Sequence, residues 1–287
     1  MIKVNGVPVE IGSFPDGTIL MKQGYVDENY AGNDKCGIPF VDIHWFYEND
    51  RELVALIYLT RHIRSFGYET IDLFMPYIPN ARQDRVKNPE DIFTLKYFAD
   101  IINSLNFNSV TVLDPHSIVS EALINKLRKF SPVNYINQII QKLNIETIEL
   151  HNPMDMSTKT EYSLTMFYPD EGAMKRYAGM VNLPYAFGIK KRNWETGQIE
   201  GLDVAGAVDE IKGRDILIVD DICSRGGTFY HSAKKLKELG AKDIYLYISH
   251  CENTILEGDL LKGDLIKKVY TTNSIFTKSH EKIEVLK

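Results

Sequence analysis

Two adjacent carboxylates followed by a turn of small residues are the clearest candidates for chemistry in the sequence. Asp220 and Asp221 end an apolar run, ILIV at 216–219, and CSRGGTF follows directly. A pair of carboxylates can accept hydrogen bonds from the two hydroxyls of a ribose or from the water around Mg²⁺. The two glycines let backbone N–H groups turn inward, and the start of a helix favours an anion. The stretch therefore suits a sugar diol joined to a phosphate.

The simpler interpretation of the same residues is structural. A lone Gly-Gly-Thr is more often a plain turn that caps a helix, and Asp-Asp is often a solvated strand end. Here a buried strand, two carboxylates and Gly-Gly-Thr occur together in fixed order, with hydroxyls at Ser224 and Thr228. This combination favours a ligand site.

Elements of two alternating kinds must position this turn. Apolar runs that end in a polar turn predict buried parallel strands at 70–79, 109–116, 215–222 and 243–250. Between them, helical spacing of apolar residues predicts helices at 51–67, 91–105 and 228–241. In the second helix, the predicted buried stripe is Ile92, Leu95, Phe98, Ala99 and Ile102. Strands that alternate with helices predict an α/β fold with parallel sheets flanked by helices.

The chain repeats this pattern weakly in its two halves. In each half a strand leads to a polar turn and a helix, and a later strand ends near a histidine. A chain of 287 residues is also long for one core. We therefore predict two similar α/β domains, 1–147 and 148–287.

Composition narrows the class of protein. A net charge of −6 argues against a partner that is nucleic acid or a membrane surface. The N-terminal region has no long apolar run, so neither a signal peptide nor a membrane span is expected. The three cysteines, Cys36, Cys223 and Cys251, are typical of reduced thiols in the cytoplasm. We expect a cytoplasmic protein that binds small ligands.

The motifs resemble those of one enzyme family. ILIVDDICSRGGTF is similar to the phosphoribosyl-pyrophosphate loop of type I phosphoribosyltransferases and of ribose-phosphate pyrophosphokinases. MPYIPNARQDR resembles the pyrophosphokinase signature Pro-Tyr-x-x-x-Ala-Arg-Gln-Asp-Arg, which simple phosphoribosyltransferases lack. Four shorter matches follow the family order: SFPDGT at 13–18, DPHS at 114–117, YPDEGA at 168–173 and GIKKRN at 188–193. The resemblance covers residues 13 to about 250 and implies two type I phosphoribosyltransferase-like domains.

The resemblance also implies a reaction. The β,γ-diphosphoryl group of ATP would pass to the anomeric hydroxyl of ribose 5-phosphate, with Mg²⁺, to give phosphoribosyl pyrophosphate and AMP. Several phosphate charges meet in this step, so positioning and charge neutralisation dominate catalysis. The sequence has no GxxxxGK[ST] loop for ATP. The family is also oligomeric, so a homo-oligomer, a dimer or larger, is expected.

By resemblance, nucleotide contacts come from the first half of the chain. Arg82 would hold a phosphate, and Gln83 the adenine or ribose. Phe14 would stack on the adenine bound to a neighbouring subunit, and Asp16 would accept a hydrogen bond from its amino group. For Arg82, the competing interpretation is an exposed ion pair with a nearby carboxylate.

Metal and catalytic residues are implied in the same way. His116 and Asp170 would contact Mg²⁺ or hold a metal-bound water. Lys191 and Arg192 would close over the transferred group, although Lys190 could take the place of Lys191. A short basic run is otherwise a solvated turn. The implied contacts of the sugar phosphate are Asp220, Asp221, Ser224, Arg225, Gly226, Gly227 and Thr228.

Departures from the family pattern leave the acceptor open. Thr18 replaces a usual Glu, Asn193 stands where a second arginine could be expected, and Ser224 and Arg225 replace Asp-Thr. The change from a carboxylate to a guanidinium suits extra negative charge on the ligand. This fits a divergent branch, known from phages, that transfers diphosphate to ADP-ribose in NAD restoration. A third alternative is a non-catalytic homologue that regulates a true synthetase.

Overall fold

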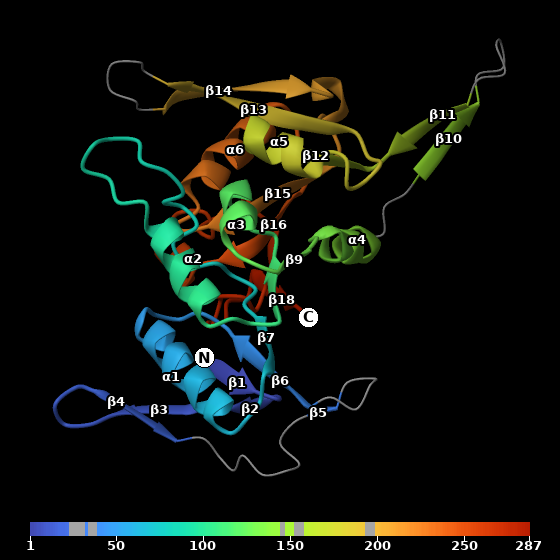
Figure 1. Ribbon diagram of the computed structural model, residues 1–287. Helices are drawn as coiled ribbons and strands as arrows, with labels where there is room; N and C mark the ends of the chain where they lie inside the picture. The colour runs from blue at the N-terminus through green and yellow to red at the C-terminus, as the bar shows by residue number, and fades with distance from the viewer. Residues whose placement is uncertain (23–31, 34–38, 144–146, 152–157, 193–198) are drawn as a thin grey trace. The chain divides into compact units, whose positions relative to one another are not determined.

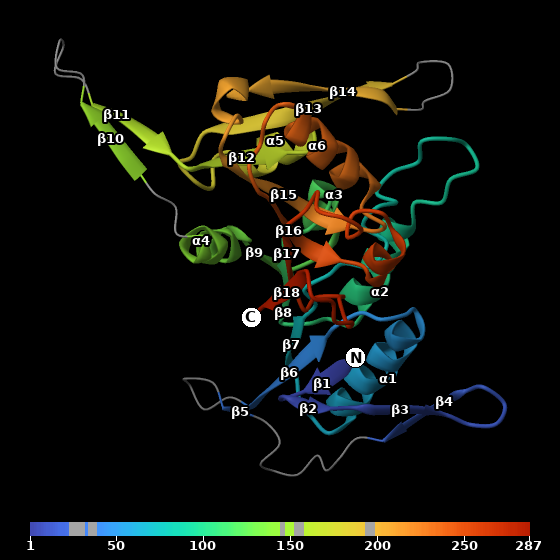
Figure 2. The same ribbon diagram turned by 180° about the vertical axis from the view of Figure 1, so that it is seen from behind.

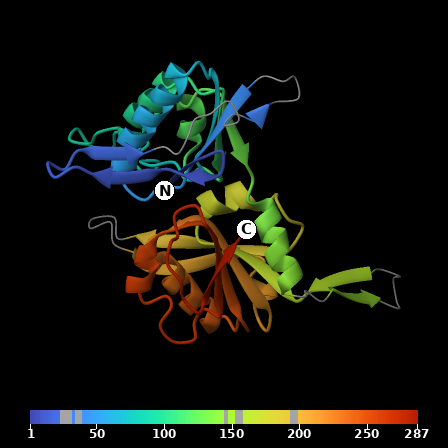
Figure 3. The same ribbon diagram turned by 90° about the horizontal axis from the view of Figure 1, so that it is seen from below.

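The computed structural model describes residues 1–287 except 23–31, 34–38, 144–146, 152–157 and 193–198 (Figure 1). The chain forms two compact units, Met1–Ser131 and Pro132–Lys287. Helix α4 (Val133–Lys142) belongs to the second unit, because Ile136 and Ile139 pack into its core. Figure 3 shows this helix, in green, alongside the second unit's sheet. The domain limit between 147 and 148 stays a prediction, and it lies beyond α4 in the chain.

The first unit is a sheet whose parallel strands follow chain order. The strand order is β2-β1-β6-β7-β8-β9, with β5 (Gly32–Asn33) paired to β6. Its strands are β1 (Ile2–Val4), β2 (Val7–Pro8), β6 (Pro39–Trp45), β7 (Thr70–Phe74), β8 (Ser109–Leu113) and β9 (Leu127–Phe130). Strands β6 to β9 are mutually parallel, and the helices between them are α1 (Arg51–Ser65), α2 (Thr94–Ser104) and α3 (Ile118–Leu123). A separate hairpin joins β3 (Glu10–Ser13) to β4 (Ile19–Lys22).

The second unit has the larger run of parallel strands, in the order β14-β13-β12-β15-β16-β17-β18. These strands are β12 (Leu164–Tyr168), β13 (Tyr185–Arg192), β14 (Ile199–Gly206), β15 (Asp215–Cys223), β16 (Ile244–Cys251), β17 (Lys268–Thr272) and β18 (Ile283–Leu286). All neighbours are parallel except β13 and β14. Helices α5 (Glu171–Tyr177) and α6 (Gly227–Glu238) follow β12 and β15; the short helices η1 (Val208–Glu210) and η2 (Asn253–Glu257) lie in loops. A hairpin joins β10 (Thr147–His151) to β11 (Thr158–Tyr162).

The second sheet changes its direction of growth between β12 and β15. After β12 the chain adds β13 and β14 on one side, and it then returns to add β15 on the other side (Figure 2). Right-handed connections then place α5 and α6 on opposite faces of the sheet. Accordingly, Tyr177 of α5 and Phe229 of α6 lie in different apolar clusters. Loops that diverge in this way leave a crevice at the carboxyl ends of the strands, where such folds bind ligands.

The predicted α/β class is confirmed and each predicted strand occurs, but β7 ends at Phe74 and β8 at Leu113 rather than at 79 and 116. All eight residues of β16 are buried, as expected for a central parallel strand. In α2, Leu95, Phe98, Ala99 and Ile102 are buried as predicted. Ile92 is 61% exposed, so its assignment to the buried stripe was wrong. The helix begins only at Thr94, because Asp91 accepts hydrogen bonds from the backbone N–H groups of 87 and 88 and extends the preceding turn.

Within the described part of the chain, no helix combines the length and the apolar character that a membrane crossing requires.

Candidate active site

The two adjacent carboxylates lie at the carboxyl end of β15, at the point where the second sheet changes direction. The backbone N–H of Asp221 donates to Oδ1 of Asp220 at 2.9 Å. Asp221 is buried, and its Oδ2 lies 2.7 Å from Nη1 of Arg176 on α5. Burial raises the pKa of Asp220 well above its ordinary value, and the charges of Asp221 and Asp170 raise it further. Negative charge is therefore concentrated here beyond what one arginine offsets.

Asp170 lies at the end of the neighbouring strand β12 and begins α5. Its Oδ1 accepts a hydrogen bond from the backbone N–H of Ala173 at 3.0 Å, so it caps the helix. A side chain at Gly172 would place a Cβ 3.2 Å from that oxygen. The capping role is structural by itself, but Asp170 is also near enough for its charge to raise the pKa of Asp220.

The turn after β15 depends on a glycine in the left-handed region. Gly226 has φ +78°, and a Cβ there would lie 2.8 Å from the side chain of Leu260. Gly227 begins α6, and a Cβ there would meet nothing within 4 Å. Helix α6 has twelve residues, so its N-terminus presents a full helix dipole to the turn. Thr228 is half-buried in the first turn of this helix.

The segment 252–258, which follows β16, contacts the turn after β15. The hydroxyl of Ser224 donates to Oε2 of Glu252 at 2.7 Å, and Nη2 of Arg225 lies 3.1 Å from Oε2 of Glu257. A Cβ at Gly258 would lie 1.9 Å from the carbonyl oxygen of Arg225, so only glycine fits. Sequence reasoning assigned Ser224 to phosphate and did not anticipate its carboxylate partner. The pair joins residues 28 positions apart, which no local pattern reveals.

Sequence reasoning also missed Arg176. It lies 45 positions before Asp221, in the basic pair KR at 175–176. The only local signal is helical spacing after Asp170, which does not say which of the two cations faces the sheet. In the structure Lys175 pairs with Glu171 at an exposed position, and Arg176 is directed to β15.

In the first unit, the turn after β7 is joined to the turn after β8. The hydroxyl of Ser117 donates to Oδ2 of Asp84 at 2.6 Å, beside the half-buried His116. Asp84 also accepts hydrogen bonds from Arg85, which lower its pKa to about 2. Asp84, a carboxylate close in sequence to Arg82, is thus paired with Arg85. The motifs PYIPNARQDR and DPHS, predicted to hold nucleotide and metal, therefore lie together.

The two residues of this turn that are predicted to bind nucleotide, Arg82 and Gln83, are exposed. Gln83 Oε1 accepts a hydrogen bond from the hydroxyl of Thr94 at 2.8 Å, at the start of α2. Its backbone N–H donates to the carbonyl of Asn80, whose φ of +64° reverses the chain. Arg82 projects from the same turn and is exposed. The turn is thus held at both ends while its functional groups face solvent.

The hairpin of β3 and β4 carries Phe14 and Asp16 at its exposed tip. Oδ1 of Asp16 accepts hydrogen bonds from the backbone N–H and the hydroxyl of Thr18, at 2.9 and 2.7 Å, which lower the pKa of Asp16. Thr18, the departure from the family's Glu, thus fixes the Asp16 carboxylate. Phe14 is 48% exposed, as a residue that contacts another molecule would be.

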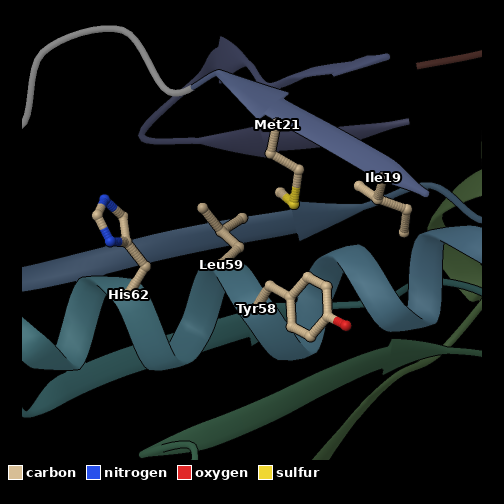
Figure 4. A pocket seen from close by; sticks show the side chains of 5 residues that line it. All are labelled: Ile19, Met21, Tyr58, Leu59 and His62. Atoms are coloured by element: carbon tan, nitrogen blue, oxygen red, sulfur yellow. The ribbon is translucent and has the colours of Figure 1, made fainter. Parts of the chain in front are cut away.

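The base of this hairpin rests on α1. Figure 4 shows Ile19 and Met21 of β4 above Leu59, Tyr58 and His62 of α1, where they line an apolar pocket of about 290 Å³. Arg51 at the start of α1 also donates to the carbonyl of Gly12. These contacts set the direction in which the tip projects.

The predicted catalytic residues lie at the outer end of β13. The backbones of Lys191 and Arg192 pair with Gly201 and Ile199 of β14, with an irregularity in register between them. Their side chains, that of Lys190 and the whole of Asn193 lie outside the described residues. Their roles stay predictions.

Comparisons with known proteins agree with the motifs. A ribose-phosphate pyrophosphokinase of Saccharolobus solfataricus is 26% identical over 272 residues, which cover 94% of this chain and 85% of that protein. The same enzyme of Thermococcus kodakarensis is 28% identical over 275 residues, covering 94% and 86%. No model of a protein family matches the chain.

A comparison with solved structures shows a similar fold. The crystal structure of phosphoribosylpyrophosphate synthetase from Mycobacterium smegmatis has a TM-score of 0.72 and 19% identity, and it covers 97% of this chain and 85% of that one. The two units thus have the type I phosphoribosyltransferase-like fold predicted from the sequence. With its motifs in family order, the chain is similar to ribose-phosphate pyrophosphokinases over most of its own length and of theirs, as a divergent member of that family would be.

Proposed function

We propose that the protein transfers the β,γ-diphosphoryl group of ATP to the anomeric hydroxyl of ribose 5-phosphate. The main support is the site near the carboxyl end of β15, where the sheet changes its direction of growth. There Asp220 is followed by the turn at Gly226 and then by helix α6. The names of the relatives, ribose-phosphate pyrophosphokinase, support this choice of reaction.

Each unit would bind one substrate. In the second unit, Asp220 accepts hydrogen bonds from the ribose hydroxyls, and the N-terminus of α6 holds the 5-phosphate. In the first unit, Arg82 binds a phosphate of ATP and Gln83 binds the adenosine. The anomeric oxygen forms a bond to the β-phosphorus, the bond from that phosphorus to the α,β-bridging oxygen breaks, and AMP leaves with that oxygen. The proton of the anomeric hydroxyl passes to solvent, and Lys191 and Arg192 stabilise the negative charge on the transferred group.

The acidic groups of the second unit fit Mg²⁺. Asp170 follows β12 and Asp220 lies near the carboxyl end of the neighbouring strand β15, and the concentration of negative charge there suits a hard cation. Mg²⁺ is commonly held by one or two carboxylates, water and substrate phosphates. Among the residues that the structure describes, no group of three or more acidic, histidine or cysteine side chains could hold a metal ion. When bound, the ion would neutralise charge on the β- and γ-phosphates; Asp170 and His116 would hold it or its water.

Turnover of the purified chain tests this proposal. ATP, Mg²⁺ and ribose 5-phosphate should give AMP and phosphoribosyl pyrophosphate in equal amounts, and Lys191→Ala should abolish the reaction. Hydrolysis of ATP without transfer, or no AMP with any sugar, would contradict it. The second outcome would favour the non-catalytic, regulatory alternative.

ADP-ribose is a second candidate acceptor, because of the position of Arg225. Its side chain is 73% exposed and its partner Glu257 is 59% exposed, at the outer end of the turn. Such exposed pairs are weak, so an added phosphate could replace the carboxylate. Rates with equal concentrations of the two sugars decide between the acceptors. Arg225→Ala should lower the rate with ADP-ribose selectively if that sugar is the substrate.

We further propose a cytoplasmic homo-oligomer in which the hairpin tip acts on a neighbouring subunit. The exposed Phe14 and the ordered Asp16 support this role. Phe14→Ala and Arg82→Ala should each be nearly inactive, and a mixture of the two should regain activity after subunit exchange. Two inactive variants that stay inactive when mixed, in an oligomer that exchanges subunits, would contradict sharing.

A further inference from the structure

The two carboxylates at the end of β15 have different surroundings. Neighbouring residues of a strand point to opposite faces, so Asp220 and Asp221 cannot both face the same ligand in the same way. Asp221 lies on the face of Leu217 and Val219, in the cluster that packs against α5, and its side chain is 5% exposed. Asp220 is only half-buried. Asp221 is therefore the inner member of the pair.

The inner carboxylate is connected to Asp170 through one short helix. Asp170 caps the N-terminus of α5, with its Oδ1 3.0 Å from the N–H of Ala173. Arg176, near the other end of α5, contacts Asp221 at 2.7 Å and is 31% exposed. Tyr177 anchors the same end of the helix in the core. Helix α5 thus links the ends of β12 and β15 through a side chain at each of its ends.

We propose that Arg176 is a positioning residue of the sugar site: it holds Asp221 in place and thereby sets the spacing of Asp170 and Asp220. This inference rests on the proposed function and goes beyond it, because that function assigns no role to Arg176, whose guanidinium is paired with the buried Asp221. Asp220 meets the sugar hydroxyls, and Asp221 orients the strand end from inside. Partners that orient ligating carboxylates commonly matter as much as the ligands themselves.

A role of Arg176 in stability alone and a role in positioning the sugar site lead to different expected results. Loss of Arg176 alone leaves Asp221 buried without its cation, which destabilises any protein. Removal of both charges relieves that penalty. The double variant Arg176→Met with Asp221→Asn should therefore unfold at a temperature close to that of the wild type, whichever role is correct. Only the binding of the sugar then separates the two roles.

The experiment compares five proteins: the wild type, Arg176→Met, Arg176→Lys, the double variant and a control, Lys175→Met. We expect the KM for ribose 5-phosphate to rise roughly 10- to 100-fold in Arg176→Met and to stay raised in the double variant. Arg176→Lys should recover part of this loss. The KM for ATP should change little, because the predicted nucleotide residues belong to the other unit. Lys175→Met is the matched control, since Lys175 lies on the same helix in an exposed pair with Glu171.

Two outcomes would overturn the inference. Recovery of the sugar KM together with stability in the double variant would show that Arg176 only balances a buried charge. An equal effect of Lys175→Met would show that any cation on α5 acts in the same way. Calorimetric titration with ribose 5-phosphate and Mg²⁺ gives the same comparison without turnover. A wild type that binds the sugar but releases no AMP would therefore contradict the proposed function and still test the role of Arg176.

Discussion

The two units use the same strand, turn and helix to present functional groups, but they bury them differently. In the first unit, the parallel strands β6 to β9 follow chain order, and Arg82 and Gln83 project into solvent from a turn. In the second unit, the order reverses between β12 and β15, and the acidic groups are drawn into the structure, with Asp221 only 3% exposed. The reversal in strand order thus goes with a buried Asp221, whereas the turn of the first unit that carries Arg82 and Gln83 is exposed.

The difference has an electrostatic consequence. Asp84 in the first unit receives hydrogen bonds from Arg85 and Ser117 and is stabilised as a carboxylate. Asp220 in the second unit is desolvated beside like charges and is destabilised as a carboxylate. The first arrangement stabilises the fold. In the second, the charged form of Asp220 would be stabilised by hydrogen bonds from a sugar or by a bound cation.

The largest expected effect is on sugar binding in the second unit. Asp220→Asn should raise the KM for the sugar by about 10- to 100-fold, since hydrogen bonds to a charged group contribute about 1.5–3 kcal/mol. The fold should persist, because the change removes a carboxylate that burial disfavours. Steady-state kinetics with varied sugar and fixed ATP measure this effect. An unchanged sugar KM would contradict the assignment of the site.

The second largest expected effect is a difference in stability and sugar binding between alanine substitutions at two adjacent glycines. Gly226→Ala should cost about 1–3 kcal/mol of stability through its positive φ and the contact with Leu260, and should weaken sugar binding. Gly227→Ala should do neither, because a Cβ there meets nothing within 4 Å. Gly17→Ala, in the hairpin of the first unit, has a φ of +86° but open space, and should cost less than Gly226→Ala. Denaturant unfolding of the three variants tests this order.

The smallest effect is an opposite dependence of stability on pH. Asp84 has a pKa of about 2 in the fold against 3.8 for the ordinary group, so its stabilisation is present above pH 3.8 and is lost as the pH falls toward 2. The pKa of Asp220 is raised, so folding loses stability as the pH rises from 3.8 through the raised value. At pH 7, Asp84→Asn should therefore lower the free energy of unfolding and Asp220→Asn should raise it. Amide hydrogen exchange followed in each unit provides the measurement, and shifts of equal sign would contradict the comparison.

Local sequence patterns predicted β15, the turn after it and α6, but neither β12 nor α5. The apolar run at 216–219 and the two glycines predicted β15 and the turn, and helical spacing predicted the buried stripe of α2 apart from Ile92. Ile92 failed because the turn that Asp91 closes delays the start of the helix. Spacing alone does not show where a turn ends and a helix begins.

The partners of the functional residues could not be predicted, because they are distant in sequence. Arg176 meets Asp221 only because β12 and β15 become neighbours after the chain has added β13 and β14 elsewhere. Ser224 meets Glu252 only because β16 pairs with β15.

By itself, the sequence determined which chemical groups stand at the ends of strands and which family they resemble. The tertiary structure decided which of those groups are buried, which are charged and which meet, because burial and pairing depend on the order of strands in the sheet. Residues with the same local pattern, such as Asp220 and Asp221, thus acquire different roles.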